Sequence, residues 1–378
     1  MAKITYYLGA GASYNSCPIL ENQAEMMIKV AEFEIRKYTT ISNGSGGHKS
    51  NNYDFNLEEK YKLEDDNQLQ ILWNIGYFGN KAKEYNTIDT YARKLFLNDE
   101  TGELNLLKMS VSVFFDLWEN FYEERYQNLS EKKYTKIDNR YKSIFSILLN
   151  KAENGIKLNN DFKFISWNYD LQIENAYKMF LKDETEIDFN RVNENFKFKD
   201  QKDSEINDVF HLNGHRGFFT EKKHTEHEEF ILKISNNFKD YWEKIHCLYN
   251  STLRGRANFN SFIKYAWEHV DLNDIFFNKI STVMNNTEVL IIIGYSFPAF
   301  NRKIDQFLFS KIDTNKIKKI IYQDPNGTIQ LIENLFENPN VIKNKIEIIS
   351  ETKSLTQFYL PNDYFIEQKI TNPEFFVI

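Results

Sequence analysis

An apolar segment that runs directly into a glycine turn is the feature that most constrains how this chain folds. Residues 4–8 are apolar, β-branched or aromatic, and they lead into Gly9-Ala-Gly-Ala-Ser13. The pattern predicts a buried strand and a tight turn that opens a helix. Glycine permits unusual backbone angles at Gly9, and the missing Cβ of Gly11 lets a ligand approach the main chain. Because helix N-termini bind phosphate, the turn predicts a nucleotide site, although an ordinary strand-to-helix turn also fits.

Further apolar segments predict five more strands, most of them ending in a polar or glycine-containing turn. They span residues 162–167, 209–212, 289–293, 317–322 and 345–349. Alternation of strands and helices predicts an α/β fold, a Rossmann-like parallel sheet with helices on both faces and large helical insertions. Right-handed crossovers place the turns at one carboxyl edge of such a sheet. We therefore expect residues 9–13, 168–170, 213–217, 294–296 and 323–326 to converge on one crevice.

The remaining sequence predicts one domain, residues 1–378, with two insertions. Residues 20–160 and 220–285 have mainly helical spacing of apolar side chains, and we expect no strand between Tyr38 and Asp161. Hydrophobic residues make up 42% of the chain and aromatic residues 16%, which is enough for a substantial core. The insertions are therefore expected to belong to one globular unit rather than to independent folds.

Charge and cysteine content exclude several classes of protein. The formal net charge of -7 argues against nucleic-acid backbones and anionic membranes as direct partners. Cys17 and Cys247 are the two cysteines, so a four-cysteine zinc site is excluded and we expect no zinc. Met1-Ala-Lys3 leads straight into the first strand, and no apolar run approaches the roughly 20 residues that span a bilayer. These features predict a cytoplasmic protein.

Two common nucleotide-binding classes do not fit the glycine turn. A dehydrogenase requires Gly-x-Gly-x-x-Gly, but Tyr14 occupies the third glycine position, and a helical pattern replaces the expected second strand. A phosphate-binding P-loop requires Gly-Lys-Ser/Thr, which does not follow Gly11. The sequence therefore disfavours both hydride transfer and phosphoryl transfer.

Four motifs in order resemble those of the sirtuin-like NAD-binding family. They are Gly9-Ala-Gly-Ala-Ser13 with Pro18 nearby, Ser166-Trp-Asn-Tyr-Asp170, His211-Leu-Asn-Gly214 and Gly294-Tyr-Ser296. The sequence Gly294-Tyr-Ser-Phe-Pro298, followed by Asp305, is similar to the bacterial anti-phage defence branch of that family. The resemblance touches about half the chain, and residues 20–160 and 220–285 match none of the family's motifs.

The resemblance implies a binding site for NAD as substrate. Gly9, Ala10, Gly11, Ala12 and Ser13 would contact the NAD phosphates. Asn168 and Asp170 would lie beside the nicotinamide ribose, and Gly294 and Ser296 would approach the adenosine half. Asp324 either accepts a hydrogen bond from a ribose hydroxyl or is a turn residue before Pro325.

The catalytic groups depart from the family's pattern, because Asn213 stands where the family usually has its catalytic histidine. Asn168 suits the aiming of a water molecule, since its amide both donates and accepts without adding charge. Asp170 either favours developing positive charge or caps a helix, the cap being the expected role. His211 is either a base near the ribose or a half-buried strand residue, and His215 lies in a glycine-flanked loop from which it could swing inward.

These observations predict an NAD glycohydrolase that releases nicotinamide and ADP-ribose. By the resemblance it would deplete NAD during phage infection, as a homo-oligomer activated by assembly or by a partner protein encoded nearby. The partner would be an ATPase, an Argonaute-like protein or a nucleotide-processing subunit. The alternative is a catalytically silent subunit that binds NAD or ADP-ribose, which the asparagine at position 213 favours. A sirtuin deacylase is the least favoured reading, because the zinc cysteines are missing.

Overall fold

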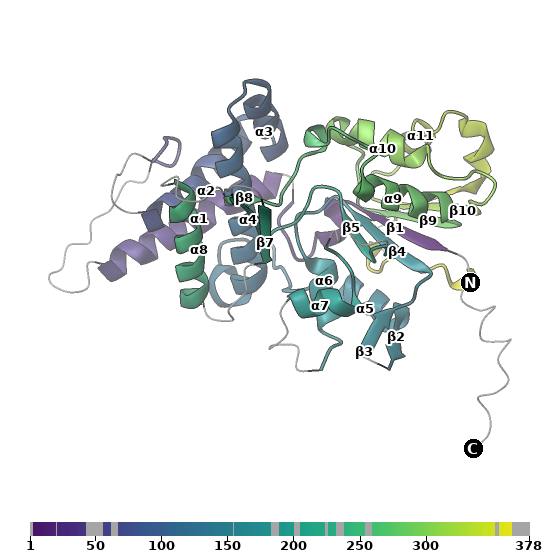
Figure 1. Cartoon of the computed structure of the whole chain (residues 1–378), viewed down its shortest axis with the longest axis horizontal. Helices are drawn as coiled ribbons and strands as arrows, with labels where there is room; N and C mark the ends of the chain where they lie inside the picture. The colour runs from purple at the N-terminus through teal and green to yellow at the C-terminus, as the bar shows by residue number, and fades with distance from the viewer. Residues whose placement is uncertain are drawn as a thin grey trace, which may run out of the picture.

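A six-stranded parallel β-sheet forms the centre of the computed structural model (Figure 1). Its strands are β1 (Ile4–Leu8), β4 (Phe162–Ser166), β5 (Val209–His211), β9 (Val289–Ile293), β10 (Lys319–Gln323) and β11 (Ile346–Ile349). Their spatial order is β11-β10-β9-β1-β4-β5. The structure describes residues 3–19, 21–42, 56–61, 67–153, 155–182, 189–199, 205–223, 226–231, 238–253, 259–351 and 355–364.

Helices cover both faces of this sheet, which confirms the Rossmann-like α/β fold. One face carries α9 (Ile275–Asn286), α10 (Arg302–Phe309) and α11 (Ile329–Glu333), and the other carries α5 (Asn139–Leu148), α6 (Gln172–Lys178) and α7 (Phe189–Asn195). All five residues of β9 are buried, as its continuous apolar sequence requires of a strand with both faces covered. The same holds for β1 at the middle of the sheet.

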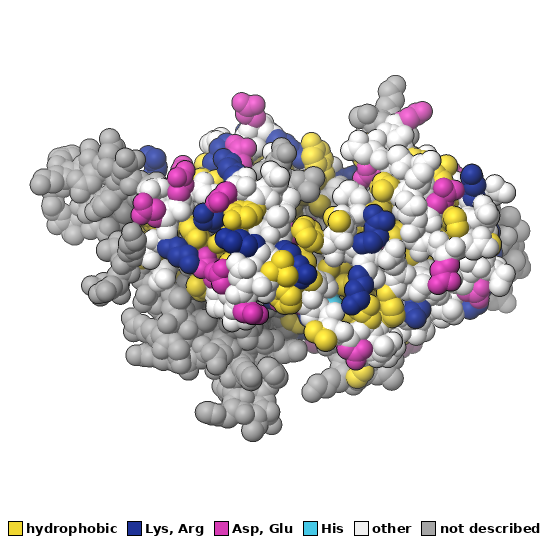
Figure 2. Space-filling model, turned by 90° about the horizontal axis from the view of Figure 1, so that it is seen from above, with side chains coloured by type: hydrophobic (Ala, Val, Ile, Leu, Met, Phe, Trp, Pro, Cys, Tyr) yellow, Lys and Arg dark blue, Asp and Glu magenta, His cyan; other side chains and the backbone are white. Residues whose placement is uncertain are grey.

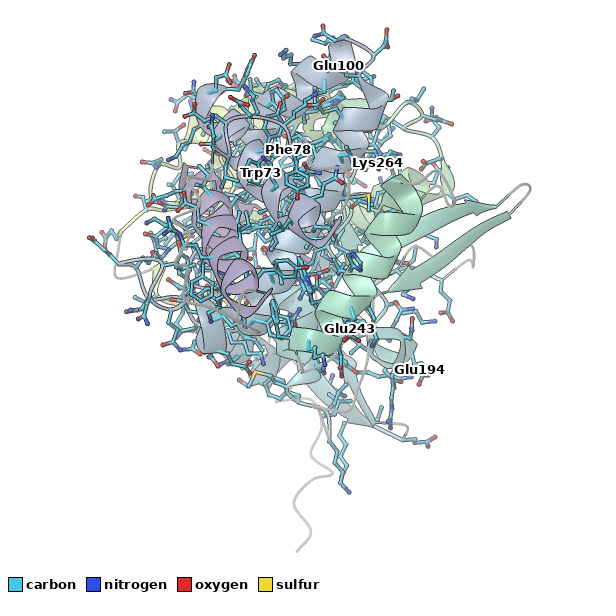
Figure 3. All side chains as sticks on the ribbon, turned by 90° about the vertical axis from the view of Figure 1, so that its left-hand side faces the viewer. Trp73, Phe78, Glu100, Glu194, Glu243 and Lys264 are labelled. Carbon is cyan, nitrogen blue, oxygen red and sulfur yellow. The ribbon has the colours of Figure 1, made fainter. Side chains whose placement is uncertain are left out.

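A second group of helices lies beside the sheet and has a hydrophobic core of its own. It contains α1 (Glu21–Ser42), α2 (Asn67–Glu84), α3 (Ile88–Leu97), α4 (Thr101–Phe121) and α8 (Phe238–Leu253), with the π-helical turn η2 (Tyr122–Tyr126). Figure 3 views this group from its outer end, where Phe78 is buried in the core and the partly buried Trp73 packs against that core. We refer to these elements as the helical insertion. Parts of the predicted insertion 20–160, at residues 43–55 and 62–66, lie outside the described residues.

The structure contains strands where the sequence predicted mainly helix. A hairpin of β2 (Leu149–Ala152) and β3 (Gly155–Leu158) precedes β4, so the expectation of no strand before Asp161 was wrong. Its residues alternate only weakly in polarity and most stay partly or fully exposed, which removes the usual strand signal. Within 220–285, β6 (Phe218–Lys223), β7 (Glu226–Ile231) and β8 (Phe259–Ser261) form a small antiparallel sheet beside α8. Residues 224–225, 232–237 and 254–258 of that segment lie outside the described part.

Candidate functional site

The strand order creates a crevice at the carboxyl edge of the sheet. From β1 the chain goes first to β4 and β5 on one side, and then returns to β9, β10 and β11 on the other. The two connections therefore diverge at β1. Ligands of open α/β sheets bind at such a switch point, outside the carboxyl ends of the strands.

A cavity of about 1070 Å³ lies at this edge, between the sheet and the helical insertion. Eight of the sequence-predicted site residues line it: Ala10, Gly11, Asn168, Asp170, Asn213, Gly294, Ser296 and Asp324. Each of the five predicted turns contributes at least one of them. The predicted residues Gly9, Ala12, Ser13, His211 and His215 do not line the cavity.

The glycines bring two backbone turns into direct contact with each other. A Cβ on Gly9 would lie 2.6 Å from the Gly294 oxygen, and a Cβ on Gly11 would lie 2.7 Å from the Gly294 Cα. Two hydrogen bonds join the turns, from Gly9 N to Ile293 O at 3.0 Å and from Gly11 N to Gly294 O at 2.9 Å. Close packing of the turns after β1 and β9 therefore already requires these glycines, whether or not a ligand approaches them.

The turn after β1 does not lead directly into the α-helix that the sequence predicted. The turn forms a four-residue 3-10 helix, η1 (Ala10–Ser13), and α1 begins only at Glu21. The N–H of Gly11 donates to Gly294 O and that of Ala12 to Gly9 O. The turn therefore opens a short 3-10 helix instead of an α-helix, and its Gly11 and Ala12 N–H groups already donate to protein carbonyl groups.

Asn168 is fixed in orientation at the cavity wall. Its Nδ2 donates to Ser13 Oγ at 3.2 Å, and its backbone N–H donates to Ser166 Oγ at 3.1 Å. Ser13 is fully buried, so it holds the Asn168 amide from behind rather than facing the cavity. The sequence predicted this asparagine but not its hydrogen bond with Ser13, because the two residues lie in turns that follow different strands.

Asp170 combines a helix-capping role with a place at the cavity wall. Its Oδ1 accepts from Gln172 N at 3.2 Å, next to the start of α6. Burial and the nearby Glu119 carboxylate raise the pKa of Asp170, and the hydrogen bond with Ser13 opposes them, so that the pKa lies at about 7. The side chain therefore exchanges a proton near neutral pH while it bounds the cavity.

Neither histidine expected near the ribose reaches the cavity. His211 is 5% exposed, and its Nε2 lies 2.8 Å from Glu174 Oε1 and its Nδ1 lies 3.4 Å from Asn168 O. Burial lowers the pKa of His211, but Glu174 outweighs it, so the pKa lies above the ordinary value. His211 thus stands behind Asn168 as an imidazole paired with a carboxylate.

His215 is enclosed rather than free to swing. Its Nδ1 faces Arg216 O at 2.9 Å, and burial holds its pKa well below the ordinary value. The sequence argument placed His211 and Asn213 on one side of a continuing strand. Because β5 already ends at His211, that alternation stops, and only Asn213 lines the cavity.

Asn213 presents an amide oxygen that the described protein does not pair. Its Nδ2 donates to Trp167 O at 3.1 Å, whereas its buried Oδ1 has no hydrogen-bond partner within the described residues. The following Gly214 has a φ of 64°, and a Cβ there would lie 1.9 Å from Phe262 O. This geometry requires glycine and locks Asn213 against the wall, with its buried Oδ1 unpaired within the described residues.

Sequence reasoning missed the wall that the helical insertion contributes. Thr87, Asp89 and Thr90 at the start of α3 line the cavity together with Phe115 of α4. Asp89 accepts from Tyr169 OH at 3.0 Å, and burial raises the pKa of Asp89 to about 6. No short motif marks these residues, because they reach the cavity only through packing between distant segments.

A buried hydroxyl and carboxyl network supports the cavity floor. Asp305 accepts from Tyr7 OH at 2.6 Å and from Tyr295 OH at 2.8 Å, and Trp167 Nε1 donates to Tyr7 OH at 2.9 Å. Trp167 and Tyr295 line the cavity and stack on each other with ring centroids 6.0 Å apart. Trp167 is thus a packed anchor, as expected, and Asp305 acts through the two tyrosines.

One described cluster has the composition of a metal site but is engaged otherwise. Ligand atoms of Cys17, Glu119 and Asp170 lie within 4.8 Å of one another. Burial raises the pKa of the Cys17 thiol well above its usual value, which keeps it protonated. Glu119 accepts from Leu171 N, from Gln172 Nε2 and from Arg216. The carboxylate is therefore already used by protein donors.

Comparisons with known proteins assign no family to this chain. A scan against protein-family models finds no match, and a search of curated proteins finds none. Among the described residues, every helix is too short or too polar to cross a bilayer. On the face seen in Figure 2, Lys and Arg side chains are interspersed with Asp and Glu rather than forming a continuous basic surface.

Proposed function

We propose that this protein is an NAD glycohydrolase, which cleaves the nicotinamide–ribose bond to give nicotinamide and ADP-ribose. The observation that carries the proposal is one cavity of about 1070 Å³ at the switch point of the sheet, bordered by all five predicted turns. That is slightly larger than the roughly 300–1,000 Å³ of ordinary small-molecule sites, as an extended dinucleotide requires. The sirtuin-like motifs supply the choice of NAD.

The residues at the wall suit hydrolysis through a cationic sugar. The bond between the anomeric carbon and the nicotinamide nitrogen breaks, nicotinamide leaves neutral with the bonding electrons, and water attacks the oxocarbenium-like ribose. Asn168, held by Ser13, orients the water. Asp170 stabilises the positive sugar and takes the proton of the water, because its pKa of about 7 suits a base at neutral pH. His211 holds Asn168 from behind.

In the cell, this activity would make the protein an NAD-depleting effector of anti-phage defence. An uncontrolled NAD glycohydrolase is toxic, so we propose that assembly into a homo-oligomer or a partner encoded nearby switches it on. The partner class stays as predicted from the resemblance: an ATPase, an Argonaute-like protein or a nucleotide-processing subunit.

A second candidate is a catalytically silent subunit that binds NAD or ADP-ribose. One observation favours it: among the described residues, no histidine lines the cavity. Asn213 lies where the resemblance expects the base, and an amide cannot accept the proton of a water molecule at neutral pH. The two candidates differ in turnover and not in binding.

Nicotinamide release by the purified protein distinguishes the NAD glycohydrolase from the silent subunit. The protein is incubated with NAD, alone and with the product of a neighbouring gene, and nicotinamide is measured by chromatography. We expect Asn168→Ala to abolish release and His211→Ala to lower it strongly, while Asn150→Ala, an exposed asparagine on β2, leaves it unchanged. Wild-type rates in both Asn168→Ala and His211→Ala would reject the site, and NAD binding without release would favour the silent subunit.

A further inference from the structure

The phosphate groups of a dinucleotide need a positive partner that the turn after β1 does not supply. Its N–H groups at Gly11 and Ala12 are bonded to the protein, and its carbonyl groups point toward cations instead. Among the described residues that line the cavity, Arg140 is the only lysine or arginine. A diphosphate in the cavity would therefore lie against side-chain rather than main-chain donors.

Arg140 lies directly against this turn. Its Nη2 donates to Gly11 O at 3.0 Å and to Ala12 O at 3.1 Å, and its Nε and Nη2 also bond the buried Asp138. Its Nη1 has no hydrogen-bond partner in the part of the chain that the structure describes. One edge of the guanidinium thus fixes the turn, and its carbon lies 4.8 Å from the centre of the Phe358 ring. Nη1 keeps its capacity to donate.

Lys132 adds a second cation at the rim of the same turn. Its Nζ donates to Tyr14 O at 2.5 Å and lies 2.9 Å from the centre of the Tyr14 ring. Tyr14 is 47% exposed and lines the cavity. No carboxylate of the described chain forms an ion pair with Lys132. Partial burial and the charge of Arg140 lower the pKa of Lys132 to about 8. An anion placed between Lys132 and Arg140 would therefore stabilise the charged form of the lysine.

Positive and negative side chains lie at different places along the sheet edge, as the binding of a dinucleotide with a central diphosphate requires. Arg140 and Lys132 lie at the turn after β1, and with Asp138 they leave one positive charge in excess. Of the carboxylates that line the cavity, Asp324 follows β10 and Asp170 follows β4, one on each side of β1, and Asp89 lies in the helical insertion at the start of α3. A ligand with a central anion and polar ends fits this distribution.

We propose that Arg140 and Lys132 form a diphosphate-binding subsite at the turn after β1. The ligand class is a nucleoside diphosphate sugar or dinucleotide, whose phosphate oxygens accept from Arg140 Nη1 and from Lys132 Nζ as it leaves Tyr14 O. The subsite refines the proposed NAD site, because it assigns the charge recognition of the same cavity to two residues outside the family-like motifs.

Calorimetric titration of the full-length chain with ADP-ribose, inorganic pyrophosphate and adenosine tests the subsite. Lys132→Met keeps the apolar stem and removes the charge. We expect it to weaken ADP-ribose and pyrophosphate binding by about tenfold or more, and to leave adenosine binding unchanged. Lys133→Met is the matched control, because the hydrogen bond that this exposed neighbour makes within the described residues goes to Gln127 O and not to the turn after β1. Salt should weaken ADP-ribose binding to the wild type more than to Lys132→Met.

The outcomes separate this subsite from the NAD glycohydrolase proposal. Equal ADP-ribose affinity in wild type and Lys132→Met would overturn the subsite and leave NAD cleavage untouched. Pyrophosphate binding that depends on Lys132, in a protein that releases no nicotinamide, would support the subsite and count against the enzyme. A wild-type protein that binds neither ADP-ribose nor pyrophosphate would overturn the subsite as well.

Discussion

Gly294→Ala gives the sharpest test of how the cavity is built. Gly294 has a φ of 59°, and a Cβ there would lie 2.4 Å from the carbonyl carbon of Gly11 and 2.5 Å from Ala12 N. The left-handed backbone costs a non-glycine residue about 1–2 kcal/mol. The overlap involves backbone atoms, which cannot rotate away, and overpacking of this kind costs about 1–3 kcal/mol. We therefore expect the free energy of unfolding to fall by about 2–5 kcal/mol.

Two other glycines provide a graded comparison. Gly11→Ala has only the steric cost, because its Cβ would meet Gly294 Cα at 2.7 Å without a left-handed φ. Gly102→Ala lies in α4 with no atom within 4 Å of its Cβ, so it is neutral or stabilises by up to about 1 kcal/mol. Urea unfolding of each variant gives the free energy from the midpoint and slope. The reasoning fails if Gly294→Ala unfolds at the same urea concentration as Gly102→Ala.

Three further predictions concern buried charges and the catalytic asparagine's support. Arg216→Met leaves Asp116 and Glu119 buried without their cation and should lower the free energy of unfolding by about 3–5 kcal/mol in urea titrations, whereas loss of an exposed pair through Lys29→Met should cost less than about 1 kcal/mol. Burial raises the pKa of Asp305 to about 7, so the folded state holds a proton that the unfolded chain releases near pH 4. The free energy of unfolding should therefore fall as the pH rises from 4 to 7, and it should fall less steeply in Asp305→Asn. Parallel pH profiles of the two proteins would contradict this. Ser13→Ala removes the hydroxyl that holds the Asn168 amide and should lower kcat for NAD cleavage with a smaller change in KM, and a change in KM alone would oppose it.

The sequence predicted the sheet because its strands carry local signals. Ile4–Leu8 and Val289–Ile293 are observed with the bounds expected from their apolar runs, and the other four strands each have an end that differs by one or two residues. The hairpin at β2 and β3 was missed because its polar residues give no alternation. The sequence thus predicts a strand wherever burial on both faces requires a continuous apolar segment.

The candidate site was only partly readable. Turns after parallel strands share one edge by topology, so Asn168, Asn213 and Ser296 were placed correctly at the cavity wall. Side-chain direction beyond a strand end is set by the local turn. Of the two interpretations of His211, its contact with Glu174 and its absence from the cavity wall favour the strand residue over the base. Arg140 carries no local signal, because it reaches Gly11 O from 129 positions away in the sequence.

The junction between the sheet and the helical insertion explains why a cavity persists between them. Each side buries an apolar core, and Tyr169 packs across the junction with its ring centroid 6.1 Å from that of Phe115. Discrete polar bonds also hold the junction: Arg216 pairs with Asp116 and Glu119 of α4, and Tyr169 donates to Asp89 of α3. Polar bonds fix distance and orientation, whereas apolar surfaces collapse until they are packed. A large space bounded by both surfaces is therefore stable only while these buried bonds remain intact.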